Sequence, residues 1–315
     1  MLATNGSPAV RMIPLQSGSN GNCIYVEANG VSLLFDGGLS AAQTAARLAC
    51  HGISLAAIDA MFISHEHSDH VSSAGAVARA GGFPLYITPR TFRVAQRRFD
   101  LSTKVDIRHF QAGQSVSVGA ITVDSLPTPH DAVDGVVYVV DDGLHRLGIC
   151  TDFGHVYSEL RDLVSRVDGL YLESNYDAEK LLRGPYPAAL KARISGPRGH
   201  ISNDDAAALL ADAATDRLQW VCLAHLSAKN NTAALALQTH RAVLGDDIAL
   251  VVAKRYAATD PLCLVADMFQ NELRRSTAEA SLSAFWQQGA SVGNTESLRR
   301  PIRQRQQDSG GGFRF

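Results

Sequence analysis

Residues 61–70 read MFISHEHSDH and place four metal-competent side chains directly after a short apolar strand. His65 and His67 are two positions apart, and in an extended backbone this spacing puts both rings on the same side. Asp69 and His70 follow just before a helical stretch. Neutral imidazole and carboxylate suit a borderline divalent cation such as zinc. The segment therefore predicts a metal centre at the end of a buried strand, and it disfavours a surface cluster that binds nothing.

Three further side chains of ligand type lie at the ends of predicted strands. They are His130 in PTPHDA, Asp152 in GICTDFGH and His225 in VCLAHLS. Active sites in α/β proteins are built at such strand ends. Taken alone, each of the three is as readily a structural residue as a ligand. A single open catalytic ion needs only three protein ligands, so these residues together with 65–70 provide enough ligands for two ions.

The rest of the chain alternates between strand and helix patterns. Short apolar segments separated by Gly and Asn predict a β-meander over residues 11–35. Helical spacing predicts helices at 40–50, 71–80, 156–166, 203–214 and 228–243. Short strands dominate residues 84–150, and further buried strands are predicted at 61–64, 220–226 and 248–253. This order favours an α+β fold of two αβ halves packed sheet to sheet with helices outside, a four-layer αβ/βα sandwich.

Composition narrows the class of protein. Of 315 residues, 46% are hydrophobic and 19% are charged, which is enough apolar material for a large core and excludes wholesale disorder. The formal net charge of −2 excludes a uniformly basic surface for nucleic acid. The five cysteines have no CxxC spacing, so a reducing cytoplasm is expected. We find no signal-peptide pattern and no apolar run long enough for a membrane span.

The motif HxHxDH at 65–70, followed by His130, Asp152 and His225, resembles the metallo-β-lactamase fold superfamily of binuclear metal hydrolases over roughly residues 11–255. The resemblance implies two divalent ions per chain, zinc or manganese, with iron as a third option. It assigns His65, His67 and His130 to one ion, Asp69, His70 and His225 to the second, and Asp152 to a bridge between them. Asp36, in LLFDGG, matches the first-motif Asp, which braces the ligand loop by hydrogen bonds.

Shorter sequence segments narrow the resemblance to one branch of the superfamily. Four segments are similar to the YycJ/WalJ-like branch: SGSNGNCIYVE at 17–27, LESNYD at 172–177, RISGPRGHISN at 193–203 and HLSAKNN at 225–231. That branch is regarded as cytoplasmic nucleases, including 5′-exonucleases that act on DNA. The resemblance thus implies a phosphodiesterase, with a DNA exonuclease in DNA metabolism or repair as the first expectation. A hydroxide shared by the two ions would attack phosphorus, and Asp69 and His200 are the expected catalytic residues.

Two other classes of function remain open. The first is a small-molecule metallohydrolase, either a cyclic phosphodiesterase or a thioesterase or lactonase. PTPHDA differs from the third motif of glyoxalase II thioesterases, and the short span from Asp152 to His225 leaves no room for the inserted domain of β-CASP nucleases. The second is a non-catalytic metal-binding scaffold, which is disfavoured because no ligand position is replaced. An open positive trough would favour the nuclease, and a closed pocket would favour the small ester.

Several polar residues near these motifs are candidates for substrate binding: Ser19, Asn22, Asn175, Arg193, Asn203 and Asn230. Arg193 suits phosphate through its planar fork, and the Lys- and Arg-bearing segment 180–198 should line the path to the metals. His200 would protonate the leaving oxygen, with a helix-capping role as the alternative. Residues 17–22 would form a backbone nest for phosphate or an ordinary hairpin turn.

The C-terminal part has a different character. We expect one metallo-β-lactamase-like hydrolase domain at 1–262, a helix at 263–284 and a disordered basic tail at 285–315. VADMF at 265–269 suggests a weak sliding-clamp contact, although apolar residues at this spacing more often pack in a core. DNA is the expected partner, no membrane is expected, and the oligomeric state is open.

Overall fold

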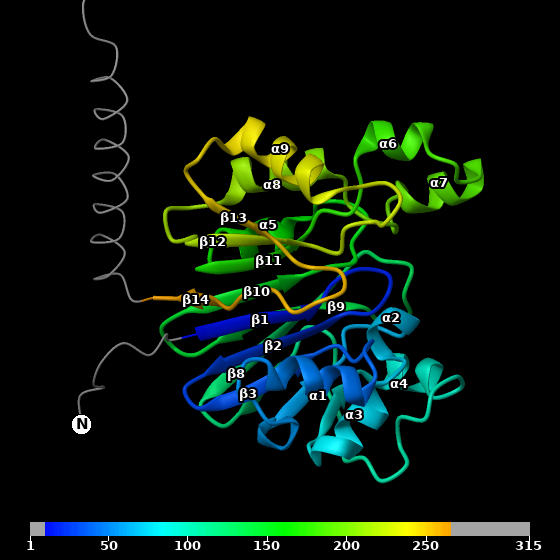
Figure 1. The fold of residues 1–315 in the computed structure, drawn as a ribbon, viewed down its shortest axis with the longest axis vertical. Helices are drawn as coiled ribbons and strands as arrows, with labels where there is room; N and C mark the ends of the chain where they lie inside the picture. The colour runs from blue at the N-terminus through cyan, green and yellow to red at the C-terminus, as the bar shows by residue number, and fades with distance from the viewer. Residues whose placement is uncertain (1–9, 266–315) are drawn as a thin grey trace, which may run out of the picture. The chain divides into compact units, whose positions relative to one another are not determined.

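Two seven-stranded sheets make up the fold, seen in a computed structural model that describes residues 10–265 (Figure 1). The first sheet has the order β14-β1-β2-β3-β4-β5-β6. Its strands are β1 (Val10–Gln16), β2 (Cys23–Ala28), β3 (Val31–Phe35), β4 (Ala60–Phe62), β5 (Leu85–Ile87), β6 (Ile107–His109) and β14 (Leu262–Leu264). The second sheet has the order β13-β12-β11-β10-β9-β8-β7. Its strands are β7 (Ser115–Val118), β8 (Ile121–Pro127), β9 (Val136–Asp141), β10 (Arg146–Cys150), β11 (Gly169–Glu173), β12 (Trp220–Ala224) and β13 (Ala249–Val252).

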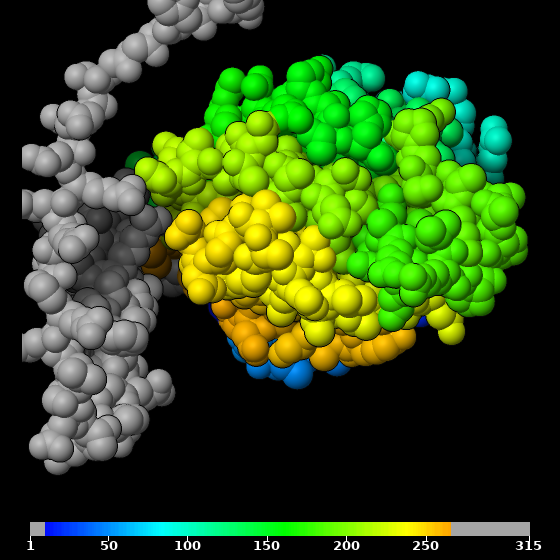
Figure 2. Space-filling model, turned by 90° about the horizontal axis from the view of Figure 1, so that it is seen from above, coloured from blue at the N-terminus to red at the C-terminus, as the bar shows by residue number. Residues whose placement is uncertain are grey.

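Helices cover the outer face of each sheet (Figure 1). The helices that precede the second sheet are α1 (Ala41–Ala49), the 3₁₀ turn η1 (Leu55–Ala57), α2 (Ser68–Val71), α3 (Ala74–Gly81) and α4 (Pro89–Ala95). The later helices are α5 (Ser158–Val164), α6 (Ala178–Arg183), α7 (Ala188–Ile194), α8 (Asn203–Ala213) and α9 (Ala233–Leu244). Figure 2 views the outer face of the second half, where α9 (yellow) lies beside the residues of the preceding helices in green and yellow-green.

Local sequence signals explain the strand connections. Asn29 and Gly30 both have positive φ, so they form the tight turn that joins β2 to β3, with Ala28 paired to Val31. The expected β-meander is therefore present. From β3 to β6 and from β10 to β13 the neighbouring strands are parallel. Parallel strands direct their carboxyl ends to the same edge of a sheet, and the predicted ligands follow several of these ends.

The main hydrophobic core lies between the two sheets and draws residues from both. Phe62 is buried at its centre and stacks on Phe35 and Tyr86, with ring centroids 5.6 and 4.7 Å apart. Replacing such a residue with Ala typically costs about 3–5 kcal/mol. Two further clusters join each sheet to its own helices. These three apolar layers confirm the predicted αβ/βα sandwich.

The C-terminal boundary differs from the prediction. Residues 262–264 form β14, which pairs antiparallel with β1, so the predicted helix does not begin at 263 and the domain does not end at 262. The indole Nε1 of Trp220 donates to the Cys263 carbonyl at 2.9 Å and fixes this edge strand. The remainder of the predicted helix, the basic tail and residues 266–269 of the clamp motif lie outside the described residues. Within residues 10–265, no helix is long and apolar enough to cross a membrane.

Candidate metal centre

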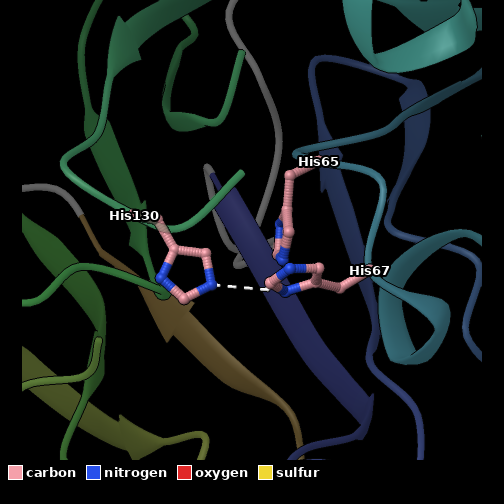
Figure 3. A group of neighbouring side chains, drawn as sticks. All are labelled: His65, His67 and His130. Atoms are coloured by element: carbon pink, nitrogen blue, oxygen red, sulfur yellow. Dashed lines mark hydrogen bonds between the residues drawn. The ribbon is translucent and has the colours of Figure 1, made fainter. Parts of the chain in front are cut away.

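Three histidines from two loops converge on one point, as Figure 3 shows. His65 and His67 come from the loop between β4 and α2, and His130 follows β8. His67 Nδ1 lies 3.3 Å from His130 Nε2. Two of the other ring nitrogens have an acceptor in the protein, Ser64 Oγ at 2.9 Å from His65 Nδ1 and Gly199 O at 2.9 Å from His130 Nδ1. His67 Nε2 lies 3.4 Å from Asp131 Oδ1.

A second group combines Asp69, His70 and His225. Asp69 Oδ2 lies 3.5 Å from His70 Nε2 and 3.4 Å from His225 Nε2. The ring nitrogens that face away from Asp69 again have hydrogen-bond partners. His70 Nδ1 lies 2.7 Å from Asp36 Oδ2, and His225 Nδ1 lies 3.1 Å from Glu173 Oε1. Metal-binding histidines characteristically donate their other N–H to such an acceptor, which fixes the tautomer and the ring orientation.

Asp152 lies between the two groups, where the family resemblance implies a bridging ligand. Its Oδ2 is 3.3 Å from His70 Nε2, and its Oδ1 is 3.8 Å from His130 Nε2. The structure therefore brings all seven predicted ligands into one cluster. Three of the chain's non-glycine residues with left-handed φ belong to this region, namely Asp36 (63°), Asp152 (65°) and His225 (52°). Such backbone conformations are costly for these residues, and they concentrate at functional sites.

Divalent cations fit this donor set. In the described part of the chain, His65 Nε2 and Asp152 Oδ2 are buried at the cluster and have no hydrogen-bond partner. Burial, followed by neighbouring His70, holds the pKa of His65 well below its usual value, so its ring is neutral and able to bind a cation. Burial would lower the pKa of His225, but Asp152, Asp69 and Glu173 raise it to about 10. This shift reflects an excess of negative charge, which a bound cation would neutralise.

Asp36 braces the ligand loop as the resemblance implies. Its Oδ1 accepts the Ser64 backbone N–H at 2.9 Å and the Ser64 hydroxyl at 2.8 Å, while its Oδ2 contacts His70. The Asp36 loop also lies directly against the Asp69 loop. A Cβ added at Gly38 would lie 1.8 Å from the Asp69 carbonyl oxygen, so only glycine allows this approach.

Glu173 is a site residue that our sequence analysis did not identify. It ends β11, is fully buried, and its Oε2 accepts the backbone N–H groups of Asp152 and Phe153 at 3.0 and 3.2 Å. Its Oε1 lies 2.7 Å from His200 Nδ1 and 3.1 Å from His225 Nδ1. A carboxylate at the end of the apolar run GLYLE carries the same signal as the other strand-end ligands, so this rule would have found it.

His200 borders a cavity of about 330 Å³ that opens onto the cluster of predicted metal ligands. Because Glu173 occupies its Nδ1, Nε2 is the ring nitrogen left to face this cavity. Burial alone would lower the pKa of His200, but the charge and hydrogen bond of Glu173 raise it above its ordinary value. His200 does not cap the helix that follows it. The adjoining helix α8 is capped instead by Ser202, whose hydroxyl accepts the Asp205 N–H.

Two of the six predicted substrate residues line this cavity, Ser19 and Arg193. The other four are buried in polar networks, and each contacts protein groups: Asn22, Asn175, Asn203 and Asn230. The Asn22 backbone N–H donates to the Asp69 carbonyl at 2.7 Å, and Asn175 Nδ2 donates to the His225 carbonyl at 2.8 Å, so these two support the ligand loops. The position of these amides beside the motifs indicated that they lie near the site, but it could not show which way they point.

The segment 180–198 lines the cavity with only one of its basic side chains, Arg193. Arg183 pairs with Glu179 on its own helix, and Lys191 Nζ donates to the Leu182 carbonyl. Arg198 donates to the His130 carbonyl at 2.9 Å and so holds that ligand loop. Residues 17–22 form a closed turn, in which the Gly18 N–H donates to Asn22 Oδ1 at 2.7 Å and Gly21 N donates to Gly18 O at 2.9 Å.

The family can now be assigned. The family model described as the beta-lactamase superfamily domain matches residues 32–221, which include six of the seven clustered ligands. This chain belongs to the metallo-β-lactamase superfamily. Within it, the chain is 33% identical over 230 residues to exodeoxyribonuclease YycJ of Bacillus anthracis, covering 73% of this chain and 87% of that protein. It is 36% identical over 228 residues to exodeoxyribonuclease WalJ of Streptococcus pneumoniae, covering 71% of this chain and 84% of that protein.

Solved structures confirm the metallo-β-lactamase fold. The fold protein YhfI from Bacillus subtilis aligns with a TM-score of 0.62 at 18% identity, covering 80% of this chain and 99% of that chain. A diphosphatase from the PhnP family aligns with a TM-score of 0.57 at 16% identity, covering 81% of this chain and all of that chain. The predicted recognition of the YycJ/WalJ-like branch is confirmed, and the protein is a hydrolase with the metallo-β-lactamase fold.

Proposed function

We propose that this metallo-β-lactamase-fold hydrolase is a two-metal phosphodiesterase that degrades DNA as an exonuclease of the 5′ type. One observation carries the proposal: five of the seven clustered ligands, a Glu173-bound His200 and Arg193 all line a single cavity. The exodeoxyribonuclease names of the YycJ and WalJ relatives support DNA as the substrate. A role in DNA metabolism or repair and a cytoplasmic location belong to the same proposal.

The ligand groups divide between two divalent ions, with zinc or manganese preferred and iron a third option. His65, His67 and His130 would hold one ion, Asp69, His70 and His225 the other, and Asp152 both. When bound, the ions supply Lewis acidity, which lowers the pKa of water toward ~7 and neutralises charge on the phosphate oxygens. No serine or cysteine nucleophile is needed, and Asp69 acts by holding its ion.

The protein's own groups place the phosphodiester and move the proton. Arg193, on α7, binds the non-bridging oxygens of the phosphate from the outer wall of the cavity. His200 donates the proton from Nε2 to the leaving oxygen, and Glu173 holds the ring in place through Nδ1. Ser19 lies on the cavity wall and provides a hydroxyl for the sugar-phosphate backbone.

A small-molecule phosphodiesterase is the second candidate. The cavity of about 330 Å³ is at the small end of ligand pockets, which span about 300–1,000 Å³. A cavity of this size suits a terminal nucleotide or a compact cyclic phosphodiester better than the middle of a duplex. It thus agrees with action at a strand end and also with a small free substrate.

An assay on end-labelled DNA distinguishes these functions. Purified protein with zinc or manganese is incubated with single-stranded and duplex DNA labelled at either the 5′ or the 3′ end. The proposal predicts early release of mononucleotide from the 5′ label, with His67→Ala inactive. Hydrolysis of a cyclic phosphodiester with no loss of DNA would establish the second candidate and refute the first.

A further inference from the structure

We propose that Asp131 is a positioning residue that fixes the metal ligand His67 and links it to the phosphate-facing Arg193. The inference rests on the proposed role of His67 as a ligand, and it adds a residue that neither the motif nor the family comparison assigns. Its basis is the placement of the two carboxylate oxygens, which face in different directions. One oxygen lies among the ligands, and the other lies on the guanidinium of α7.

His67 turns a different ring nitrogen toward the ligand cluster from the other predicted ligand histidines. Its Nδ1 is 3.3 Å from His130 Nε2, so Nδ1 points inward, and its Nε2 points to Asp131 Oδ1 at 3.4 Å. His67 is also the most exposed of these ligands, with 30% of its side chain accessible, whereas His65, His70, His130 and His225 are buried. An exposed imidazole with a single outward contact depends on that contact for its tautomer and orientation.

Asp131 is held in place by two kinds of contact. Arg193 Nε donates to its Oδ2 at 2.7 Å, and Arg193 Nη2 lies 2.6 Å from the same oxygen. Asp131 Oδ1 has no hydrogen-bond partner of good geometry in the described residues and is also 3.3 Å from His130 Nε2. This oxygen is therefore available to His67 once its ring is ordered by an ion.

The arrangement couples substrate and metal through one carboxylate, and the coupling is reciprocal. Arg193 and the histidine group share a single carboxylate, and a substrate phosphate would compete with Asp131 for the guanidinium. When a phosphate binds Arg193 in place of Asp131, the full negative charge of Asp131 interacts with His67. Removing Asp131 should consequently weaken metal binding, while removing Arg193 should not, because the carboxylate stays beside His67.

Metal affinity separates this role from a purely structural one. Zinc binding to the folded apoprotein is measured by competition with a chromophoric chelator for the wild type, Asp131→Ala, Arg193→Ala and Asp134→Ala. Asp134 is a matched control, since it lies in the same loop and its side chain makes no hydrogen bond or ion pair among residues 10–265. Asp131→Ala is expected to weaken one of the two binding steps by about 10- to 100-fold. Asp134→Ala is expected to retain wild-type affinity, and Arg193→Ala is expected to retain or exceed it.

Two results would overturn the inference: an unchanged zinc affinity in Asp131→Ala, or an equal loss in Asp131→Ala and Arg193→Ala. An equal loss would mean that the ion pair between Asp131 and Arg193 acts only by holding the loop in place. If Asp131→Ala does not fold, Asp131→Asn serves instead, because it keeps an acceptor oxygen and should lose affinity to a smaller extent. The readout needs no nuclease activity, so failure of the proposed substrate leaves this test intact.

Discussion

Glu173 is bonded through both carboxylate oxygens and has no exposed surface. It fixes the backbone of the bridging Asp152 on one side and the rings of His200 and His225 on the other. Removing one partner of such a buried charged network leaves an uncompensated group and is costly. The chemistry at the residue scale therefore depends on this glutamate as well as on the predicted ligands, and Glu173 itself lies within ligand distance of Asp152, His200 and His225.

Substituting His200 tests its role as the proton donor. His200→Ala should lower kcat on DNA by about 10²–10⁴-fold, a typical value for general acid catalysis, with metal content unchanged. The loss should shrink on a p-nitrophenyl phosphodiester, because that leaving oxygen departs without a proton. Steady-state kinetics on the two substrates measures the difference. Equal losses on both, with intact folding and two metals, would return His200 to a positioning role.

The Glu173–His200 pair should behave as one unit. Glu173→Gln removes the charge that holds the His200 ring, so kcat should fall close to the level of His200→Ala. Groups that act together are non-additive, and the double variant should therefore be no slower than His200→Ala alone. Single-turnover rates on DNA provide the comparison. Independent, multiplying losses would show that Glu173 acts through His225 or the backbone rather than through His200.

At the scale of elements, strand ends explain what the sequence predicted and what it did not. The seven ligands follow β4, β8, β10 and β12, so apolar runs ending in His or Asp located them without a structure. The short helices α6 and α7 were not predicted, because α7 buries none of its residues and so has no apolar face to detect. The C-terminal boundary was misjudged because β14 is only three residues long, and its assignment depends on pairing with β1.

Helix α7 brings Arg193 to the cavity wall, so its contribution belongs to this scale. Arg193→Ala should raise KM for DNA by about tenfold, since a charge-assisted contact to phosphate is lost from a partly solvated position. Hydrolysis of an uncharged ester should change little. Arg183→Ala is the matched control, because Arg183 pairs with Glu179 on α6 instead of facing the cavity. Equal effects of Arg193→Ala on both substrates would argue against a phosphate contact.

Across the whole molecule, the metal centre joins the two halves of the sandwich. His65, His67, Asp69 and His70 come from the first half, whereas His130, Asp152 and His225 come from the second. The fold class and this division could be read from the order of strands and helices. The directions of the Asn22, Asn175, Asn203 and Asn230 side chains could not be read from the sequence, because a polar residue in a loop near the site can face the cavity or the interior equally well.

Metal removal should destabilise the whole molecule. A ligand that binds only the folded state adds about 2.7 kcal/mol of stability at 100 times its Kd, and without cations Asp69, Asp152 and Glu173 are left close together. The melting temperature should therefore fall on treatment with a chelator and recover when zinc or manganese is restored. Restoring calcium or magnesium instead is the control, since His-rich sites disfavour hard cations. The same melting temperature in all conditions would contradict the expectation that bound cations stabilise the contact between the two halves of the sandwich.

The two-ion centre is the central claim, and the metal content of active protein tests it most directly. Elemental analysis of protein purified without added metal or chelator, alongside its activity on a phosphodiester, should give two divalent ions per chain. Asp152→Ala should lose most of this metal, because its carboxylate is the one group that lies between both ligand sets. One ion or none in a fully active preparation would contradict the claim.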